Sequence, residues 1–237
     1  MKRSNIDIPI CSECDAKGEG VLCNLSHKSK EILEEHKGDN FYKKGQTIFY
    51  EGNNANSLYC IYKGKVKLSK LGEDGKEQIV RFAKTSDILG YRSLLSDEAY
   101  HATATAMEDS YICLLSKDKF IKLMEADPKL SLNIVQLLSR DLRGAEQLLI
   151  DIAQKSVIER IAEALVLLKN TFGYEEDNMT LDVSLTRSEI ADIAGTTTET
   201  TIRTLAQLST NGLIELSGKK IKIIDFMKLV SQAAIFD

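Results

Sequence analysis

The stretch DPKLSLNIVQLLSRDLRGAEQLLIDIAQ, residues 127–154, decides how the chain is organised. Asp127-Pro128 is a typical helix start, because the aspartate side chain caps the first turn and proline at the first helical position has no N–H to lose. Apolar residues then recur at alternating spacings of three and four, at Val135, Leu138, Leu142, Ala145, Leu149 and Ile152. This narrow stripe predicts a coiled-coil seam with a second copy of the chain.

The other side of the same stretch is also apolar, at Leu137, Leu148 and Ile150, and we expect it to pack on its own chain. At 1.5 Å per residue, such a helix is about 40 Å long. That length is enough to carry one domain at each end. The sequence therefore predicts two unlike halves joined by a helix that also joins two subunits.

Composition places the chain among globular proteins. Its 237 residues are 43% hydrophobic and 28% charged, enough to fill two cores and too mixed for a wholly disordered chain. Met1-Lys2-Arg3 leads into no continuous apolar run, and no segment has the length of a membrane span, so we expect a cytoplasmic protein with no membrane partner. The odd number of cysteines, five, favours thiols or metal ligands over a disulfide framework.

Charge is distributed unevenly. The formal net charge is −4, but residues 185–224 alone carry five basic and four acidic side chains, which leaves −5 for the rest of the chain. This mild asymmetry permits DNA binding by the C-terminal third without requiring it.

Three cysteines cluster near the N-terminus, at Cys11, Cys14 and Cys23. The segment has little apolar periodicity, so a bound metal is the obvious means of ordering it. Adding His27 gives a pattern that suits a closed zinc site, and spacing alone does not separate zinc from an iron–sulfur cluster. Three thiols in a flexible tail is the remaining interpretation.

Residues 40–116 consist of short β-prone runs punctuated by glycines. The runs cover residues 47–49, 58–62, 65–71, 78–83 and 102–107. Asp74-Gly75 lies between two of them and is a strong hairpin signal. Many short strands with regular turns predict a small antiparallel barrel or roll.

The C-terminal third carries the signals of a winged helix-turn-helix. Ser156 and Glu159 form a capping box that opens a helix over residues 156–170, and Thr186 and Glu189 form a second, opening a short helix that Gly195 stops. A further helix follows, with Ile202, Leu205 and Leu208 expected to face inward. Residues 213–224 then read as two strands with Ser217-Gly218 at the turn.

Three motifs in the middle of the chain resemble the cyclic-nucleotide-binding β-roll: KGQTIFYEG at 44–52, SLY at 57–59 and KGKVK at 63–67. With the long helix and the C-terminal third, residues 11–230 resemble the CRP/FNR family of bacterial transcription regulators. The resemblance implies an α+β fold with a β-roll, a long dimerisation helix and a winged helix-turn-helix. The implied segments are 1–29 with the cysteines, 30–126 as the sensor domain, 127–155 as the dimerisation helix and 156–237 as the DNA-binding domain.

The cyclic-AMP branch of that family holds the phosphate with a Gly-Glu pair and a downstream Arg-Ser pair. Here the matching stretches are Gly90-Tyr91 and, downstream, residues 100–103 (YHAT), and Arg92-Ser93 lies too close to Gly90 to substitute. Without a guanidinium to fork onto the phosphate, the main charge-assisted contacts are lost. We therefore expect no cyclic nucleotide.

The oxygen-sensing branch has an N-terminal cysteine cluster and one further cysteine in the β-roll. AMEDSYIC at 106–113 matches the block that carries the latter. The resemblance thus implies that Cys11, Cys14, Cys23 and Cys113 ligate a [4Fe–4S] cluster. The eight-residue gap between Cys14 and Cys23 is longer than the usual one. Cys60 lies in a strand pattern, and we interpret it as a small buried hydrophobe.

In the same family, a glutamate and an arginine four residues apart on the second helix face the major groove, and Glu199 and Arg203 match them. Arginine suits guanine O6 and N7, and glutamate accepts from cytosine N4; an ordinary surface ion pair is the alternative. Thr198 and Ile202 depart from the pattern, so the half-site flanks are expected to differ. The expected DNA-contacting residues are Arg187, Thr197, Thr198, Glu199, Ile202, Arg203, Lys219 and Lys220.

No constellation of catalytic residues is present, since the three histidines are scattered and no phosphate-binding Gly-rich loop occurs. We therefore expect a non-enzymatic homodimer that binds a two-fold-related operator on double-stranded DNA, with RNA polymerase as a partner by resemblance. Oxygen, nitric oxide or redox state is the expected signal. The alternatives are a structural zinc or thiol-redox site, a haem held by His101 or a cysteine, or a stand-alone cofactor-binding or electron-transfer module.

Overall fold

The computed structural model describes residues 20–22, 25–34, 38–73 and 75–235, and the chain divides into two compact units. The first unit contains the chain up to Lys70 together with Arg81–Leu142. The second contains Leu71–Val80 and Arg143–Asp237.

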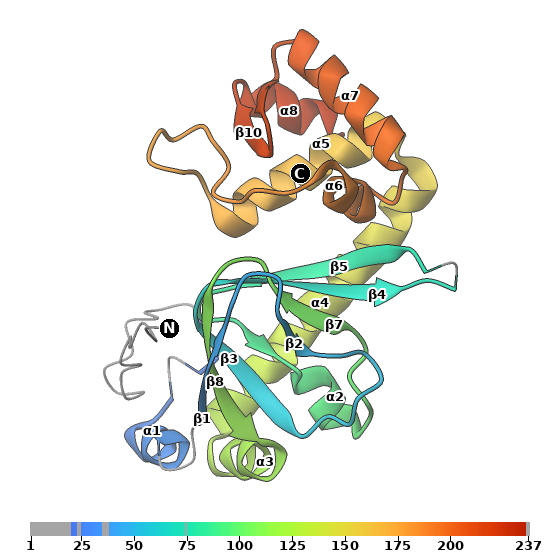
Figure 1. Cartoon of the computed structure of the whole chain (residues 1–237). Helices are drawn as coiled ribbons and strands as arrows, with labels where there is room; N and C mark the ends of the chain where they lie inside the picture. The colour runs from blue at the N-terminus through green and yellow to red at the C-terminus, as the bar shows by residue number, and fades with distance from the viewer. Residues whose placement is uncertain (1–19, 23–24, 35–37, 74, 236–237) are drawn as a thin grey trace. The chain divides into compact units, whose positions relative to one another are not determined.

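The first unit is built around two four-stranded sheets (Figure 1). Their strands are β1 (Gly38–Tyr42), β2 (Thr47–Phe49), β3 (Ser57–Lys63), β4 (Lys65–Leu71), β5 (Glu77–Lys84), β6 (Ile88–Leu89), β7 (Thr103–Ala106) and β8 (Ser110–Ser116). One sheet has the order β1-β8-β3-β6 and the other β2-β7-β4-β5. The pairs β1–β8, β3–β8, β3–β6, β2–β7 and β4–β7 are antiparallel, so the predicted antiparallel roll is confirmed.

Three of these strands, β1, β6 and β8, were not among the predicted runs. In β8 the first three residues, Ser110 to Ile112, are all buried, so the strand lacks the alternation of apolar and polar residues that marks a half-exposed strand. β6 has only two residues, and β1 is an exposed edge strand with the polar sequence GDNFY. Each therefore lacks the pattern by which a strand is recognised.

Three short helices, α1 (His27–Glu34), α2 (Tyr91–Ser96) and α3 (Lys117–Ala126), belong to the first unit, and α4 (Pro128–Gln154) begins there. Asp127 precedes α4 as predicted, and its carboxylate accepts from Leu130 N at 3.2 Å. The same carboxylate accepts from Ser29 Oγ at 2.8 Å, which ties α1 to the start of α4. These bonds hold the pKa of Asp127 below its usual value, with Ser29 as the main cause.

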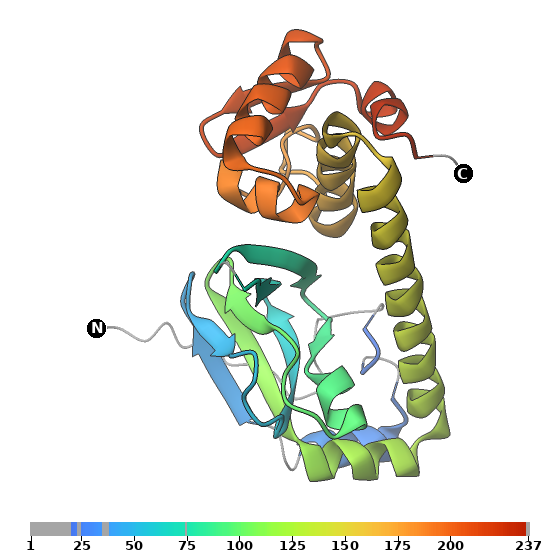
Figure 2. The same cartoon turned by 90° about the vertical axis from the view of Figure 1, so that its right-hand side faces the viewer.

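α4 is one unbroken helix from Pro128 to Gln154 (Figure 2). In its first turns, Leu130 and Ile134 are 1% exposed, and Leu137 packs against the same core. Further along, Leu148 is 39% and Ile150 is 47% exposed. The prediction that this side packs on its own chain is thus right at Leu137 and wrong at Leu148 and Ile150, because the core of the first unit covers only the first turns.

The second unit surrounds a small helical core. Its elements after α4 are α5 (Val157–Phe172), α6 (Arg187–Ala194), α7 (Thr198–Thr210), β9 (Ile214–Ser217), β10 (Lys220–Ile223) and α8 (Phe226–Gln232). Ile161 and Leu165 on α5 are fully buried, as are Ile190 on α6 and Leu205 on α7. The predicted capping boxes open α5 and α6, and antiparallel β9 and β10 form the wing.

Among the described residues, no helix combines the length and the apolar character that crossing a membrane requires.

Candidate functional site

The turn between α6 and α7 is fixed by its end residues. Gly195 closes α6 with φ of 60°, a left-handed conformation that favours glycine. Thr197 caps α7, its hydroxyl accepting from Thr200 N at 3.2 Å. Arg160 on α5 donates from Nε to Ala194 O at 2.8 Å, a link that the sequence did not indicate. The helix-turn-helix is therefore held by hydrogen bonds at both helix ends.

α7 presents two different faces. Thr201, Thr204, Leu205 and Leu208 are buried against the domain core. The opposite face exposes Glu199, Arg203 and Ile202, the last at 52%. The prediction that Ile202 faces inward is wrong, because the buried residues recur at 201, 204–205 and 208, and residue 202 lies about 100° round the helix from 201.

Glu199 and Arg203 form no ion pair with each other in the part of the chain that the structure describes. Both side chains are exposed on the same face of α7, together with Thr198. Charged and polar side chains with no internal partner, on the exposed face of a second helix, are the arrangement that major-groove readout requires.

Three further predicted DNA-contacting residues lie on or beside the wing. Arg187 at the start of α6 donates from Nη2 to Gly218 O at 3.0 Å, at the turn between β9 and β10. Burial lowers the pKa of Arg187. Lys220 is paired with Glu175 at 2.8 Å, whereas Lys219 is exposed and forms no ion pair with another described residue. Of these three side chains, Lys219 is thus the one best able to meet a phosphate.

The predicted seam residues on α4 are largely exposed. The exposed fractions are 56% for Val135, 62% for Leu142, 70% for Leu149 and 51% for Ile152, and Ala145 is also exposed. Leu138 differs, since it is partly buried against the core of the first unit. Large apolar side chains exposed at successive heptad positions of one helix are typical of an unfilled helix–helix interface.

Inside the β-roll, aromatic rings occupy the space between the sheets. Phe49 and Tyr100 stack with ring centroids 4.1 Å apart, and Tyr100 donates from its hydroxyl to Ser57 O at 2.9 Å. Gly90, with φ of 84°, packs so closely that an added Cβ would lie 2.9 Å from Ser57 O. Burial raises the pKa of Tyr59, which lies beside these rings, and Tyr100 adds to the shift.

Tyr91 and His101, which match the phosphate-binding positions of the cyclic-AMP branch, have other partners here. His101 lies at the surface, 2.8 Å from Glu98. Tyr91 is buried, and its hydroxyl donates to the carboxylate of Asp141 on α4.

Asp141 is the centre of a small polar cluster that the sequence did not indicate. Arg92 reaches its carboxylate from Nη2 at 2.7 Å and from Nε at 3.1 Å. Arg81 on β5 donates to the Tyr91 hydroxyl at 2.7 Å and lies 3.5 Å from Asp141. Three side chains of the β-roll thus meet one carboxylate on the long helix.

The predicted cluster ligands fall in two groups. Cys11, Cys14 and Cys23 lie outside the described residues, and of His27 only the backbone, at the start of α1, is described. Cys113 is half-buried on β8, directly opposite the half-buried Cys60 on β3. Across the described residues, no group of three or more histidine, cysteine, aspartate or glutamate side chains is placed to hold a metal.

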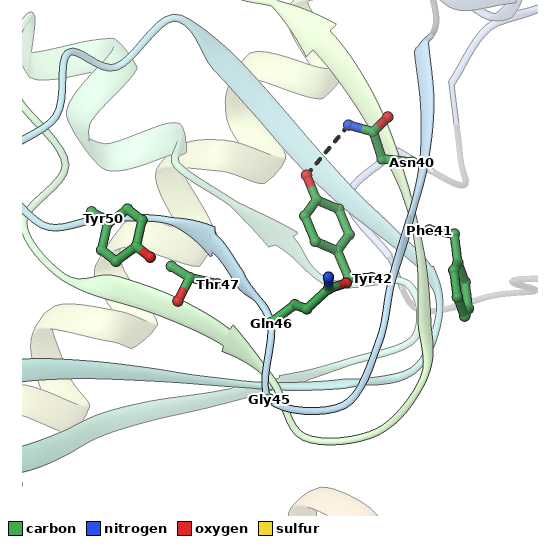
Figure 3. A pocket seen from close by; sticks show the side chains of 7 residues that line it. All are labelled: Asn40, Phe41, Tyr42, Gly45, Gln46, Thr47 and Tyr50. Atoms are coloured by element: carbon green, nitrogen blue, oxygen red, sulfur yellow. Dashed lines mark hydrogen bonds between the residues drawn. The ribbon is translucent and has the colours of Figure 1, made fainter.

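A surface pocket of about 590 Å³ lies beside β1 and β2 (Figure 3). Its lining residues are Asn40, Phe41, Tyr42, Gly45, Gln46, Thr47 and Tyr50. Asn40 donates to the Tyr42 hydroxyl at 3.3 Å (Figure 3). None of the predicted ligand, DNA-contacting or seam residues lines it.

Comparison with known proteins accounts for both units. Residues 39–127 match the family model of the cyclic nucleotide-binding domain, and residues 159–231 match that of the Crp-like helix-turn-helix domain. The transcriptional activator protein FnrA of Stutzerimonas stutzeri is 28% identical over 227 residues, covering 94% of this chain and 92% of its own. The CRP-like cAMP-activated global transcriptional regulator of Mycobacterium tuberculosis is 30% identical over 193 residues, covering 81% and 86%.

The solved structure of FixK2 from Bradyrhizobium japonicum superposes with a TM-score of 0.75 and 26% identity, over 85% of this chain and 99% of that one. The β-roll, the long helix and the winged helix-turn-helix therefore agree in sequence and in structure with one group of proteins. The chain belongs to the CRP/FNR family of DNA-binding transcription regulators.

Proposed function

We propose that this regulator binds a two-fold-related operator as a homodimer and senses oxygen, nitric oxide or redox state through a [4Fe–4S] cluster. The ligands would be Cys11, Cys14, Cys23 and Cys113. The observation that carries the proposal is the burial of the residues on either side of Cys23. Leu22 and Leu25 are each 8% exposed and belong to the core of the first unit, the unit that also carries Cys113.

The donor set fits such a cluster. Four cysteine thiolates are the usual ligands of [4Fe–4S], and the chain supplies three before α1 and one in β8. Leu22 and Leu25 are anchored in the same core as the β-roll that carries Cys113, and this supports a site shared between the two parts of the sequence. When bound, the cluster would supply a redox-active and oxygen-labile centre, and the chain's own residues would convert its presence into a change in α4.

Two connections lead from the sensor segment to α4. Ser29 on α1 bonds Asp127, immediately before the helix begins, and Ser26 N approaches the same carboxylate at 3.4 Å. Further along, the Asp141 cluster joins α2 and β5 to the helix. Movement of the segment next to Cys23 would therefore act on α4 through hydrogen bonds to Asp127, the residue just before the helix.

Dimerisation is proposed from the exposed stripe on α4. Val135, Leu142 and Leu149 are spaced by seven residues and are all more than half exposed. A second copy of the same helix would cover them in a two-stranded coiled coil. Two winged helix-turn-helices related by the same two-fold axis then suit half-sites about one helical turn of DNA apart.

A cyclic nucleotide is not proposed as the ligand. The buried Tyr91 occupies the matching position of the phosphate-binding glutamate and is already bonded to Asp141, and stacked Phe49 and Tyr100 fill space between the sheets. His101 replaces the phosphate-binding arginine and is bonded to Glu98 at the surface. The cytoplasm, where the DNA lies, is the proposed location.

The test is purification under nitrogen followed by absorption spectroscopy and by iron and sulfide analysis. A brown protein with about four iron and four sulfide per chain, bleached by air with loss of operator binding, is the expected result. A colourless protein containing zinc, or a protein with a haem Soret band, would overturn the cluster.

Serine variants assign the ligands. Cys113→Ser should lose the cluster, and Cys60→Ser should keep it. A full cluster in Cys113→Ser together with its loss in Cys60→Ser would show that the fourth ligand is Cys60.

A further inference from the structure

Cys60 and Cys113 occupy one cross-strand position of the first sheet. The register between β3 and β8 is regular over five consecutive pairs, from Ser57 opposite Ser116 to Ile61 opposite Ile112. Cys60 opposite Cys113 is the fourth of these pairs, and the irregularity in β3 begins only after Ile61. The alignment of the two cysteines is therefore fixed by regular pairing on both sides.

The two side chains lie on the same face of the sheet, because directly opposed residues of an antiparallel pair point to the same side. Their neighbours in the row are Ile88 on β6 and Asp39 on the exposed edge strand β1. Both cysteines are half-buried, in contrast to Ile61 and Ile112 next to them, which are fully buried. This row is therefore partly exposed to solvent, while the packing around it keeps the backbone in place.

Opposed residues in an antiparallel pair have Cα atoms about 4.5 to 5.5 Å apart. A disulfide needs a Cα separation of about 4.4 to 6.8 Å, so the strand register meets this requirement without a shift of either strand. In sequence the two residues are far apart, and only the sheet brings them together. The pairing is a property of the folded β-roll.

We propose that Cys60 and Cys113 form a dithiol site that peroxides oxidise to a disulfide. One thiolate attacks a peroxide oxygen, the O–O bond breaks, and a sulfenic acid forms with release of water. The sulfur of the second thiol attacks the sulfenic sulfur and expels a second water. The two thiols lose two electrons and two protons, and hydrogen peroxide is reduced to two waters. A dithiol reductant reverses the step by thiol–disulfide exchange.

The consequence for sensing rests on the proposed cluster. A sulfur held in the Cys60–Cys113 disulfide has no thiolate to offer iron, so oxidised apoprotein would not regain a cluster until it is reduced. Cys60 would then act as the residue that protects Cys113 from further oxidation and at the same time delays reloading. This role explains a cysteine opposite the proposed ligand without making Cys60 a ligand itself.

The dithiol is tested first without any cluster. In full-length protein with Cys11→Ser, Cys14→Ser and Cys23→Ser, hydrogen peroxide is added in stoichiometric amount and remaining thiols are alkylated in denaturant. Peptide mapping should find a Cys60–Cys113 cross-linked peptide, and circular dichroism confirms the fold. The matched control is the same variant oxidised in urea, where cross-linking should be slower by more than about tenfold because the effective concentration is lost.

Wild-type apoprotein, purified, stripped of iron and treated in the same way, tests the consequence. We expect the wild-type apoprotein to take up no iron after peroxide and to regain iron uptake after dithiothreitol. We expect the Cys60→Ser variant to take up iron after peroxide only if the sulfenic acid on Cys113 is first reduced by a monothiol. Equal cross-linking rates in folded and urea-unfolded protein, or oxidation of Cys113 to sulfinic acid with Cys60 unchanged, would overturn the dithiol site. Failure of the reduced wild type to bind iron would overturn the cluster alone.

Discussion

At the scale of single residues, the wing shows how neighbouring lysines come to differ. Lys219 and Lys220 are adjacent in sequence, but Glu175 neutralises Lys220 at 2.8 Å. The ion pair raises the pKa of Lys220 and keeps its charge directed at the protein. Identical residue types therefore have different potential to bind a phosphate, and only the structure separates them.

We expect Arg203→Ala to reduce discrimination at one base pair per half-site by about 1–3 kcal/mol, because a bidentate contact to guanine is lost. Lys219→Ala should instead weaken binding to all DNA sequences alike, and it should reduce the slope of log affinity against log salt concentration by about one. Lys220→Ala is the matched control, with a smaller effect. Salt titrations on specific and scrambled duplexes measure all three. Equal losses on both duplexes for Arg203→Ala would mean that Arg203 contacts only phosphate.

Asp177 makes the loop before α6 sensitive to acid. Its carboxylate accepts from Thr180 Oγ and Thr180 N at 2.7 Å and from Met179 N at 3.0 Å, and these bonds lower its pKa to about 2. A depressed pKa stabilises the fold fully above the unfolded value of about 4, and the contribution is lost as pH falls through 2. We expect Asp177→Asn to reduce the free energy of unfolding at pH 7 and to matter less toward pH 3. Urea titrations at four pH values check this, and a constant difference would contradict it.

At the scale of elements, the Asp141 cluster links α2 and β5 to α4. Removing Asp141 takes the carboxylate acceptor from Arg92 and the buried Tyr91 hydroxyl, and it takes the ion-pair partner at 3.5 Å from Arg81. We expect Asp141→Ala to lower the free energy of unfolding by about 1–3 kcal/mol, measured by urea denaturation.

Two controls bracket this effect. Tyr91→Phe removes one donor and should cost less than Asp141→Ala. Glu146→Gln changes an exposed acid on the same helix, and its effect should stay below about 0.5 kcal/mol. An Asp141→Ala protein as stable as Glu146→Gln would show that the cluster contributes nothing to the fold.

The elements that sequence reasoning found are those with a local signal. α4 begins at Pro128 because a cap and a proline mark it, and α5 and α6 begin at their capping boxes. β8 was not predicted, because a strand buried on both faces shows no alternation of apolar and polar residues. Ile202 was predicted to face inward because it is apolar, but its position round the helix places it on the exposed face. The type of a residue alone does not determine whether its side chain points into the core or toward solvent.

Long-range partners left no trace in the sequence. Asp141 meets Tyr91, fifty positions away, and Cys113 meets Cys60 through strand register. Each pairing depends on how sheets and helices come together, which no single segment encodes. The family resemblance pointed to Cys113 and to the DNA-contacting residues of α7. The Asp141 cluster, the bond from Arg160 to Ala194 and the Cys60–Cys113 pair are visible only in the folded structure.

At the scale of the whole molecule, the α4 stripe makes a prediction about assembly. Ala145 lies between Leu142 and Leu149 and leaves the stripe small and apolar there. Nothing charged opposes association at this position, so we expect the apoprotein to remain largely dimeric at micromolar concentration. The cofactor would then act on helix geometry or DNA affinity. Sedimentation of apo and holo protein measures this, and a clean apo monomer would contradict it.

Ala145→Asp tests the same seam from the other direction. Two carboxylates facing each other across a two-fold axis repel, so the variant should dissociate in the absence of cofactor. Gln136→Asp adds the same charge at an exposed position outside the stripe and should leave the dimer intact. If both variants dissociate alike, net charge rather than the seam is responsible.

The two attachment points of α4 give the helix the mechanics of a clamped rod. Asp127 is held by α1 and Asp141 by α2 and β5, and the fourteen residue steps from one to the other span about 21 Å along the axis. A twist of about 20° carries a side chain at a radius of about 5 Å through roughly 2 Å. Knobs-into-holes packing between two helices tolerates few side-chain shifts of this size. A rotation of α4 by about this angle would therefore move the dimer seam from one discrete packing register to another rather than change the packing continuously.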